Sequence, residues 1–220
     1  MKYYQKIDGG THISAREYDI ATDTVIQEGQ IVKISDGLVV AAAAGETGAI
    51  LGIAAEGHSG KPDALNPNAD GTRILVIDDP DVVMQCKAPE ITAAEGCSST
   101  TLIAAELASF ANGDFKGGYV KLLAKAEDSA NVDEIGAVRR VTSFTGTSKT
   151  FTLEEGGTPA AGDIYAVFPP IGFAKGNLSE DGTGLVLSAT ATLPLKLIGH
   201  DRALNKINLI AGKHVFAVNS

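Results

Sequence analysis

The chain has 220 residues and a formal net charge of −9, with 27 acidic residues against 18 Lys and Arg. An acidic surface repels nucleic-acid phosphates, so the composition argues against a nucleic-acid partner. Hydrophobic residues make up 44% of the chain, which excludes a disordered protein. No apolar run approaches the ~20 residues of a membrane-spanning helix, and we expect no signal peptide, because residues 1–6 lack its apolar region. We therefore expect a protein that is made in the cytosol and stays soluble, without a membrane partner.

Small side chains dominate the composition. There are 25 Gly and no Trp, and aromatic residues account for 5%, so we expect a core of small and β-branched side chains joined by many turns. The two cysteines, Cys86 and Cys97, are too few for a secreted disulfide scaffold. Both are predicted to be reduced thiols.

The first part of the chain predicts an arm followed by a small barrel. Residues 1–20 are polar, contain Gly9-Gly10 and are expected to form an N-terminal arm. Residues 21–95 contain short apolar or alternating stretches separated by turn signals, of which Asp36-Gly37 is the strongest, because it suits a two-residue hairpin turn. The strands are expected at 30–35, 38–42, 49–55, 73–77 and 82–87. Together they predict a closed or nearly closed β-barrel domain.

The second part, residues 96–220, also predicts a β domain. Residues 99–111 are ambiguous: their apolar spacing suits a helix capped by Ser98-Ser99, but equally a strand and a loop. The other expected strands lie at 119–124, 137–144, 150–153, 164–168, 185–188, 193–198, 207–210 and 214–218. The fold class is therefore mainly all-β: a small β-barrel plus a second sandwich- or barrel-like module, with at most one or two short helices.

No catalytic constellation emerges from the sequence. None of the four histidines has a zinc-ligand spacing with another His or Cys; they are His12, His58, His200 and His214. The two cysteines are no better placed, and a thiol nucleophile paired with a His base is not expected. His200-Asp201-Arg202 is the densest polar triplet. It suits a carboxylate-polarised His, but we favour a turn after a strand that ends at Ile198-Gly199. We predict no enzymatic activity and no catalytic residue.

The sequence also contains no complete metal-binding or cofactor-binding motif. Residues 66–71 resemble the first half of a calcium loop, with oxygen ligands at alternate positions followed by Gly, but the twelfth position, which should be Glu, is Ile77. Asp78, Asp79 and Asp81 are interpreted as a solvated turn rather than a cation site. The glycines at 113 and 117–118 lack the Lys-Ser/Thr that follows a phosphate-binding loop. We predict no metal site and no cofactor.

Two stretches resemble phage virion proteins. The first is Ile26-Gln-Glu-Gly-Gln-Ile-Val-Lys-Ile-Ser-Asp-Gly followed by Gly48-Ala-Ile-Leu-Gly-Ile-Ala, which resembles the small β-barrel of capsid decoration proteins. The second spans residues 113–170, with Gly136-Ala-Val-Arg-Arg-Val-Thr and Gly162-Asp-Ile-Tyr-Ala-Val-Phe, and is similar to a β module of phage head and tail proteins. The C-terminal 45 residues show no such resemblance.

This resemblance implies a non-enzymatic virion protein that binds the outer capsid surface as a decoration, or cement, protein. It implies the major capsid protein lattice as partner, a homo-oligomer with a trimer favoured, and no catalytic residues. The alternative is a phage tail, baseplate or head-fibre protein. A glycan-binding β module is a further alternative, although sugars stack on aromatic rings and these are scarce. An enzyme of unrecognised type is the last.

The arm and two loops are the surfaces that we expect to contact partners. Residues 1–19 are predicted to add a strand to the sheet edge of a neighbouring molecule by β-augmentation. The polar loops at 57–71 and 176–184 are candidates for the outer face of the bound protein.

Overall fold

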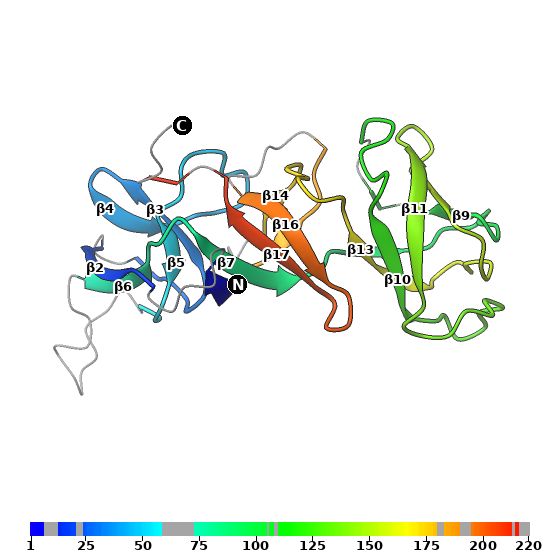
Figure 1. The fold of residues 1–220 in the computed structure, drawn as a ribbon, viewed down its shortest axis with the longest axis horizontal. Coiled ribbons are helices and arrows are strands. Elements are labelled where there is room, and N and C mark those ends of the chain that lie inside the picture. The colour runs from blue at the N-terminus through cyan, green and yellow to red at the C-terminus, as the bar shows by residue number, and fades with distance from the viewer. Residues whose placement is uncertain are drawn as a thin grey trace.

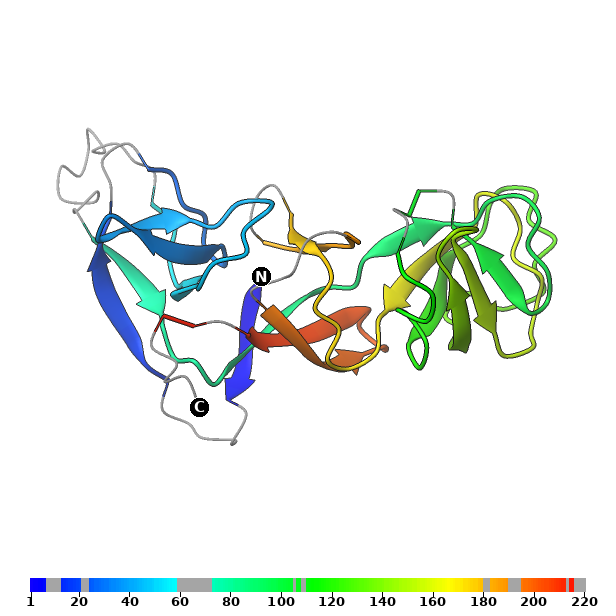
Figure 2. The same cartoon turned by 90° about the horizontal axis from the view of Figure 1, so that it is seen from above.

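The computed structural model describes residues 1–6, 13–20, 24–58, 73–104, 106–107, 110–179, 183–189, 195–212 and 214–215. Over these residues the chain is all-β and contains no helix, which confirms the predicted fold class. The molecule is elongated: a small barrel lies at each end and a central sheet lies between them (Figures 1 and 2).

The first barrel is a five-stranded sheet. Its strands pair in the order β2-β6-β5-β3-β4, and a parallel bridge between Ile20 and Val39 connects the two edge strands. Their bounds are β2 (Ala15–Asp19), β3 (Ile31–Ser35), β4 (Leu38–Ala41), β5 (Gly52–Ala54) and β6 (Arg73–Ile77). The interior is filled by small aliphatic side chains, among them Val32, Leu51 and Ile74, which are at most 1% exposed. The sheet is thus curled into a barrel, as expected, but β2 occupies the place that the sequence assigned to 82–87.

The β3–β4 hairpin follows the sequence prediction. Ser35 pairs with Leu38, so Asp36 and Gly37 form a two-residue turn, with φ values of 51° and 81°. Positive φ at both central positions defines the turn whose twist matches that of the strands.

The central sheet joins the two ends of the chain. Its order is β1-β7-β17-β16, from β1 (Lys2–Lys6), β7 (Val82–Lys87), β16 (Leu195–Asp201) and β17 (Lys206–Ala211). β1 pairs with β7 and β2 pairs with β6 of the same chain. Residues of the predicted arm thus form strands within this chain's own sheets, and both β1 and β2 lie at the ends of those sheets. Pairing of the arm with a neighbouring molecule stays a prediction.

The second barrel is a six-stranded sheet in the order β8-β13-β10-β11-β12-β9. An antiparallel bridge between Ala93 and Ala104 joins its two edge strands. The bounds are β8 (Glu90–Thr92), β9 (Thr101–Ile103), β10 (Tyr119–Ala124), β11 (Val138–Thr145), β12 (Thr150–Leu153) and β13 (Ile164–Phe168). Its core differs from that of the first barrel in holding a cluster of phenylalanines, in which Phe115 contacts Phe144 and Phe151 with ring centroids 4.8 and 5.1 Å apart.

The ambiguous segment 99–111 starts with a strand. β9 and a turn occupy its described residues, so the strand-and-loop alternative applies there and the helix is wrong. Thr101–Ile103 pairs with β12, and this non-local ladder outweighs the local helical spacing.

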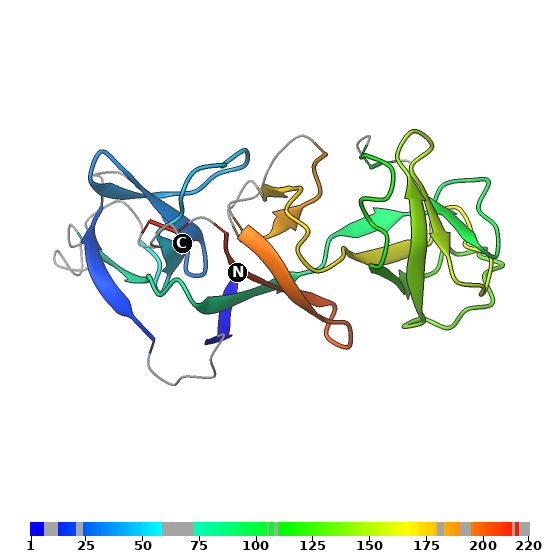
Figure 3. The same ribbon diagram turned by 45° about the horizontal axis from the view of Figure 1, so that its top comes forward.

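The strand pairing divides the chain differently from the predicted N-terminal arm and the two predicted domains, 21–95 and 96–220. The second barrel is formed by consecutive strands inserted between β7 and β16, and the last strands return to the central sheet beside β7. A short ribbon of β14 (Asn177–Leu178) and β15 (Leu185–Val186) lies between the second barrel and the central sheet (Figure 3). Only part of the expected strand 214–218 is described, because residues 216–220 lie outside the described ranges.

Over the described ranges, no helix has the length and apolar character needed to cross a bilayer.

Candidate interaction site

The His200-Asp201-Arg202 triplet fastens the β16–β17 hairpin to the second barrel. β16 extends through Asp201, so the predicted end at 198–199 is wrong. The Nε2 atom of His200 lies 2.6 Å from the carbonyl oxygen of Pro169, which makes Nε2 the protonated nitrogen, because a carbonyl only accepts. Burial lowers the pKa of His200. The Oδ1 atom of Asp201 instead accepts the backbone N–H of Leu204 at 3.1 Å, so Asp201 caps the turn.

The tip of the same hairpin packs on β10. The Arg202 guanidinium lies 4.1 Å from the centroid of the Tyr119 ring, close enough for a cation–π contact. Lys121 Nζ donates to the carbonyl oxygens of Arg202 and Ala203 at 2.7 and 3.3 Å. These contacts join the central sheet to the second barrel, and the triplet has a structural role.

The Asp78–Asp79 turn is a buried polar junction. Asp78 is 1% exposed and accepts hydrogen bonds from Ser14 Oγ at 2.7 Å and from the Tyr18 hydroxyl. Burial, followed by the bond to Asp78, raises the pKa of Tyr18 to about 12. Lys6 Nζ lies 2.9 Å from Asp79 Oδ2. The predicted solvated turn is therefore wrong for this pair. Asp78 binds side chains in and next to β2, and Asp79 binds a side chain of β1.

The remaining candidates lie in separate structural settings. Cys86 and Cys97 are free thiols, and burial raises the pKa of Cys86 to about 12, which opposes formation of a thiolate nucleophile. His58 forms a bridge with Ile26. His12 and residues 66–71 of the calcium-like pattern lie outside the described residues, and no group of three metal-binding side chains occurs within the described ranges. Gly113 and Gly117 have φ values of 83° and 86° and serve a turn before β10.

A buried network inside the second barrel was missed by the sequence analysis. Arg139 is 6% exposed and donates to the carbonyl oxygens of Glu154 and Gly157, each at 2.9 Å through Nε and Nη1, and to that of Ser99. Because side chains alternate along a strand, Arg139 shares the inner face of β11 with Val141. An Arg at a core position of the alternating pattern was the signal available in the sequence.

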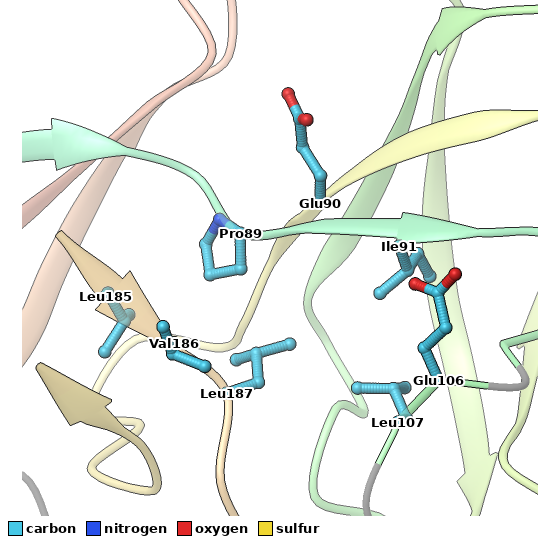
Figure 4. A pocket seen from close by; sticks show the side chains of 8 residues that line it. All are labelled: Pro89, Glu90, Ile91, Glu106, Leu107, Leu185, Val186 and Leu187. Atoms are coloured by element: carbon cyan, nitrogen blue, oxygen red, sulfur yellow. The ribbon is translucent and has the colours of Figure 1, made fainter. Parts of the chain in front are cut away.

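A groove separates the second barrel from the β14–β15 ribbon (Figure 4). Its volume is about 210 Å³. The ribbon side contributes Val186, which is 50% exposed, and the barrel side contributes Leu107, which is buried. The full lining consists of Pro89, Glu90, Ile91, Glu106, Leu107, Leu185, Val186 and Leu187. Six of these eight residues have apolar side chains, and the other two are glutamates.

Two carboxylates accompany the apolar wall. Glu90 Oε1 lies 2.6 Å from Lys87 Nζ, and its side chain points away from the space between Leu107 and Leu187 in Figure 4. Glu106 is exposed and forms no salt bridge with a described residue. The groove therefore combines apolar contact area with one negative charge that is available to a partner.

Comparisons with protein families, curated proteins and solved structures found no match to this chain.

Proposed function

We propose that this chain is a non-enzymatic structural protein of a phage virion, which binds the outer surface of the capsid as a decoration protein. The observation that carries the proposal is the use of its polar side chains. Histidine, aspartate and arginine are residue types that enzymes use in catalysis. In this chain, hydrogen bonds tie His200, Asp78 and Arg139 to neighbouring strands and turns. Such a chain works through its surfaces, and function follows from sites rather than from the fold.

The architecture also supports a role as a rigid attachment. The first and second barrels each have their edge strands bridged, and the central sheet connects barrel to barrel (Figure 1). A decoration protein binds a repeating lattice, so weak contacts of each copy are multiplied when copies are linked. The two stretches that resemble virion proteins fall in the first and second barrels, respectively.

The test is electron microscopy of intact parent phage particles labelled with gold-conjugated antibody raised against this chain. We expect label distributed over the head, with none on particles from a mutant phage that lacks the gene. Label confined to the tail, baseplate or head fibre would support the alternative virion role. Intact particles without label would contradict both virion functions.

A further inference from the structure

The groove between the second barrel and the β14–β15 ribbon contains an exposed strand edge. β8 is at the end of its sheet, and its bridge to the opposite edge strand lies at Ala93, beyond the strand itself. The N–H of Ala93 bonds to the oxygen of Asp163, and the N–H of Val167 bonds to the oxygen of Pro89. Antiparallel pairs alternate between bonded and non-bonded positions. Glu90 therefore occupies a non-bonded position, and its N–H and C=O point away from β13.

Apolar side chains border the same edge. Val186 and Leu187 extend from the ribbon, and Leu107 faces them from the barrel (Figure 4). Val186 is 50% exposed, and covering its side chain with a partner would be favourable, because apolar surface is stabilised when it is removed from water. An extended segment that bonds to the backbone of Glu90 would place a side chain between these walls, which is the arrangement used in recognition by β-augmentation.

Charge identifies the kind of segment. Glu106 lies on the groove wall without a salt-bridge partner among the described residues, whereas Glu90 is paired with Lys87. The chain as a whole carries a net charge of −9, so its field attracts a basic partner and disfavours a second acidic copy. An Arg or Lys near the inserted apolar side chain would pair with Glu106.

We propose that this groove binds an extended segment of the capsid shell protein that carries an apolar side chain next to a basic one. The segment adds a short strand to the edge of β8 at Glu90, inserts the apolar side chain between Leu107 and Val186, and pairs its basic group with Glu106. This inference rests on the proposed decoration function and names the surface by which that function operates.

The test measures binding of the purified full-length chain to shells assembled without it, by co-sedimentation at a series of protein concentrations. Val186→Asp places an uncompensated charge in the apolar wall and is expected to weaken binding about tenfold or more, as at an interface hot spot. Val25→Asp is the matched control, because Val25 is 63% exposed and adjoins the first barrel at Ile26. It should bind like wild type, and circular dichroism verifies that both variants are folded.

A second pair of variants tests the charge. Glu106→Lys is expected to weaken binding about fivefold at low salt and to reduce its salt dependence, because the basic group loses its partner. Glu134→Lys changes net charge equally at another exposed position of the second barrel and should have a smaller effect. Equal effects of the two substitutions would contradict specific pairing at Glu106 and overturn the proposed occupant.

The outcomes separate the two proposals. Wild-type binding with unchanged binding by Val186→Asp would overturn the groove as the docking site while leaving the decoration function in place. Loss of self-association in Val186→Asp, seen by light scattering with shell binding intact, would assign the groove to a second copy and overturn the inference. Failure of the wild-type chain to bind shells would overturn the decoration function and this inference with it.

Discussion

A close backbone approach makes Gly52 of the first barrel sensitive to a single added methyl group. A Cβ atom at this position would lie 2.0 Å from the carbonyl oxygen of Ile77, on the neighbouring strand. Because a backbone carbonyl cannot rotate away as a side chain does, the β5–β6 ladder would have to separate. We expect Gly52→Ala to lower the free energy of unfolding by about 1–3 kcal/mol, measured by urea denaturation.

Gly57→Ala is the control for this substitution. Its Cβ would meet atoms no closer than 3.6 Å, an ordinary contact distance, so the stability should change by less than about 0.5 kcal/mol. Equal stability of the two variants would show that the two strands are not packed as closely as the structure has them.

Two consecutive arginines in β11 should differ sharply in their contribution to stability. Arg139 is buried and donates to three backbone carbonyls, whereas Arg140 is exposed on the opposite face. Arg139→Ala leaves buried acceptors without donors, and we expect the free energy of unfolding to fall by about 3 kcal/mol. Arg140→Ala should change it by less than about 0.5 kcal/mol. Thermal and urea unfolding of both variants check this, and similar losses would contradict the assignment of the two faces.

At the scale of elements, Asp163 makes the second barrel sensitive to acid. Asp163 is fully buried. Burial alone would raise its pKa, but hydrogen bonds from the N–H groups of Ala126 and Ala160 and from Asn131 Nδ2, at 3.0, 3.0 and 2.9 Å, hold the pKa below its usual value. A carboxyl group with a depressed folded-state pKa contributes stability above its unfolded pKa and loses it as pH falls through the folded value.

We therefore expect the free energy of unfolding to fall as pH decreases below about 4, the usual Asp value. Asp163→Asn should lose about 2 kcal/mol at pH 7, because one amide oxygen cannot accept all these bonds, and it should show a shallower decrease in acid. The exposed Asp128→Asn variant should retain the wild-type profile. Parallel profiles for wild type and Asp163→Asn in urea titrations from pH 3 to 7 would contradict this role.

Strands with local turn signals were predicted well from the sequence. β6, β7, β10, β12 and β13 have the expected bounds, because alternating or β-branched stretches between Gly, Pro and Asp residues determine strand position locally. The partners of these strands were not predictable in the same way. β7 pairs with β1 and β17, which come from the two ends of the chain, and no local pattern specifies such long-range partners.

The polar clusters were harder to predict for a related reason. Asp78 accepts hydrogen bonds from Ser14 and Tyr18, which precede it by 64 and 60 residues in the chain. Because these partners are remote in sequence, the acidic turn was predicted to be solvated. The groove joins 89–91, 106–107 and 185–187, three segments that only the tertiary fold brings together. The sequence indicated a β protein that functions by binding through its surface, but it did not indicate which residues form the binding surface.

At the scale of the whole molecule, the second barrel has the arrangement of an inserted domain. Its six strands are consecutive, and residues just beyond β13 also contact it. The Phe173 ring lies in its core, 5.3 Å from the Phe115 ring, and Lys175 Nζ lies 2.7 Å from Asp114 Oδ1 in a more exposed ion pair. We expect a fragment of residues 88–175 to fold alone, with dispersed amide NMR signals and a cooperative urea transition. A collapsed NMR spectrum would show that its core depends on the central sheet.

The tip of the β16–β17 hairpin should determine how firmly the second barrel is held against the central sheet. In addition to the bond of His200 to Pro169 and the chain connections, the two parts are linked at this tip by the Arg202–Tyr119 contact and by the bonds from Lys121 to the hairpin carbonyls. Replacing both cations, in Arg202→Ala/Lys121→Ala, removes these links without altering a buried side chain. Each exposed contact is worth about 0.5–1 kcal/mol, so both halves should remain folded while their relative orientation becomes more variable.

Residual dipolar couplings provide the measurement, because they report orientation rather than stability. In the wild-type chain, one alignment tensor should fit amides of both the first and the second barrel; in the double variant, the second barrel should require a tensor of smaller magnitude. Leu204→Ala, at an exposed position of the same tip, is the control and should keep a common tensor. A common tensor in the double variant would mean that the remaining links fix the orientation without the two cations. These links are the His200–Pro169 bond and the linking segments, including the Gly172 N–H bond to the Leu197 oxygen at 2.8 Å. Because the groove lies where the second barrel meets the β14–β15 ribbon, a looser hairpin tip should also weaken binding in the groove by reducing its preorganisation.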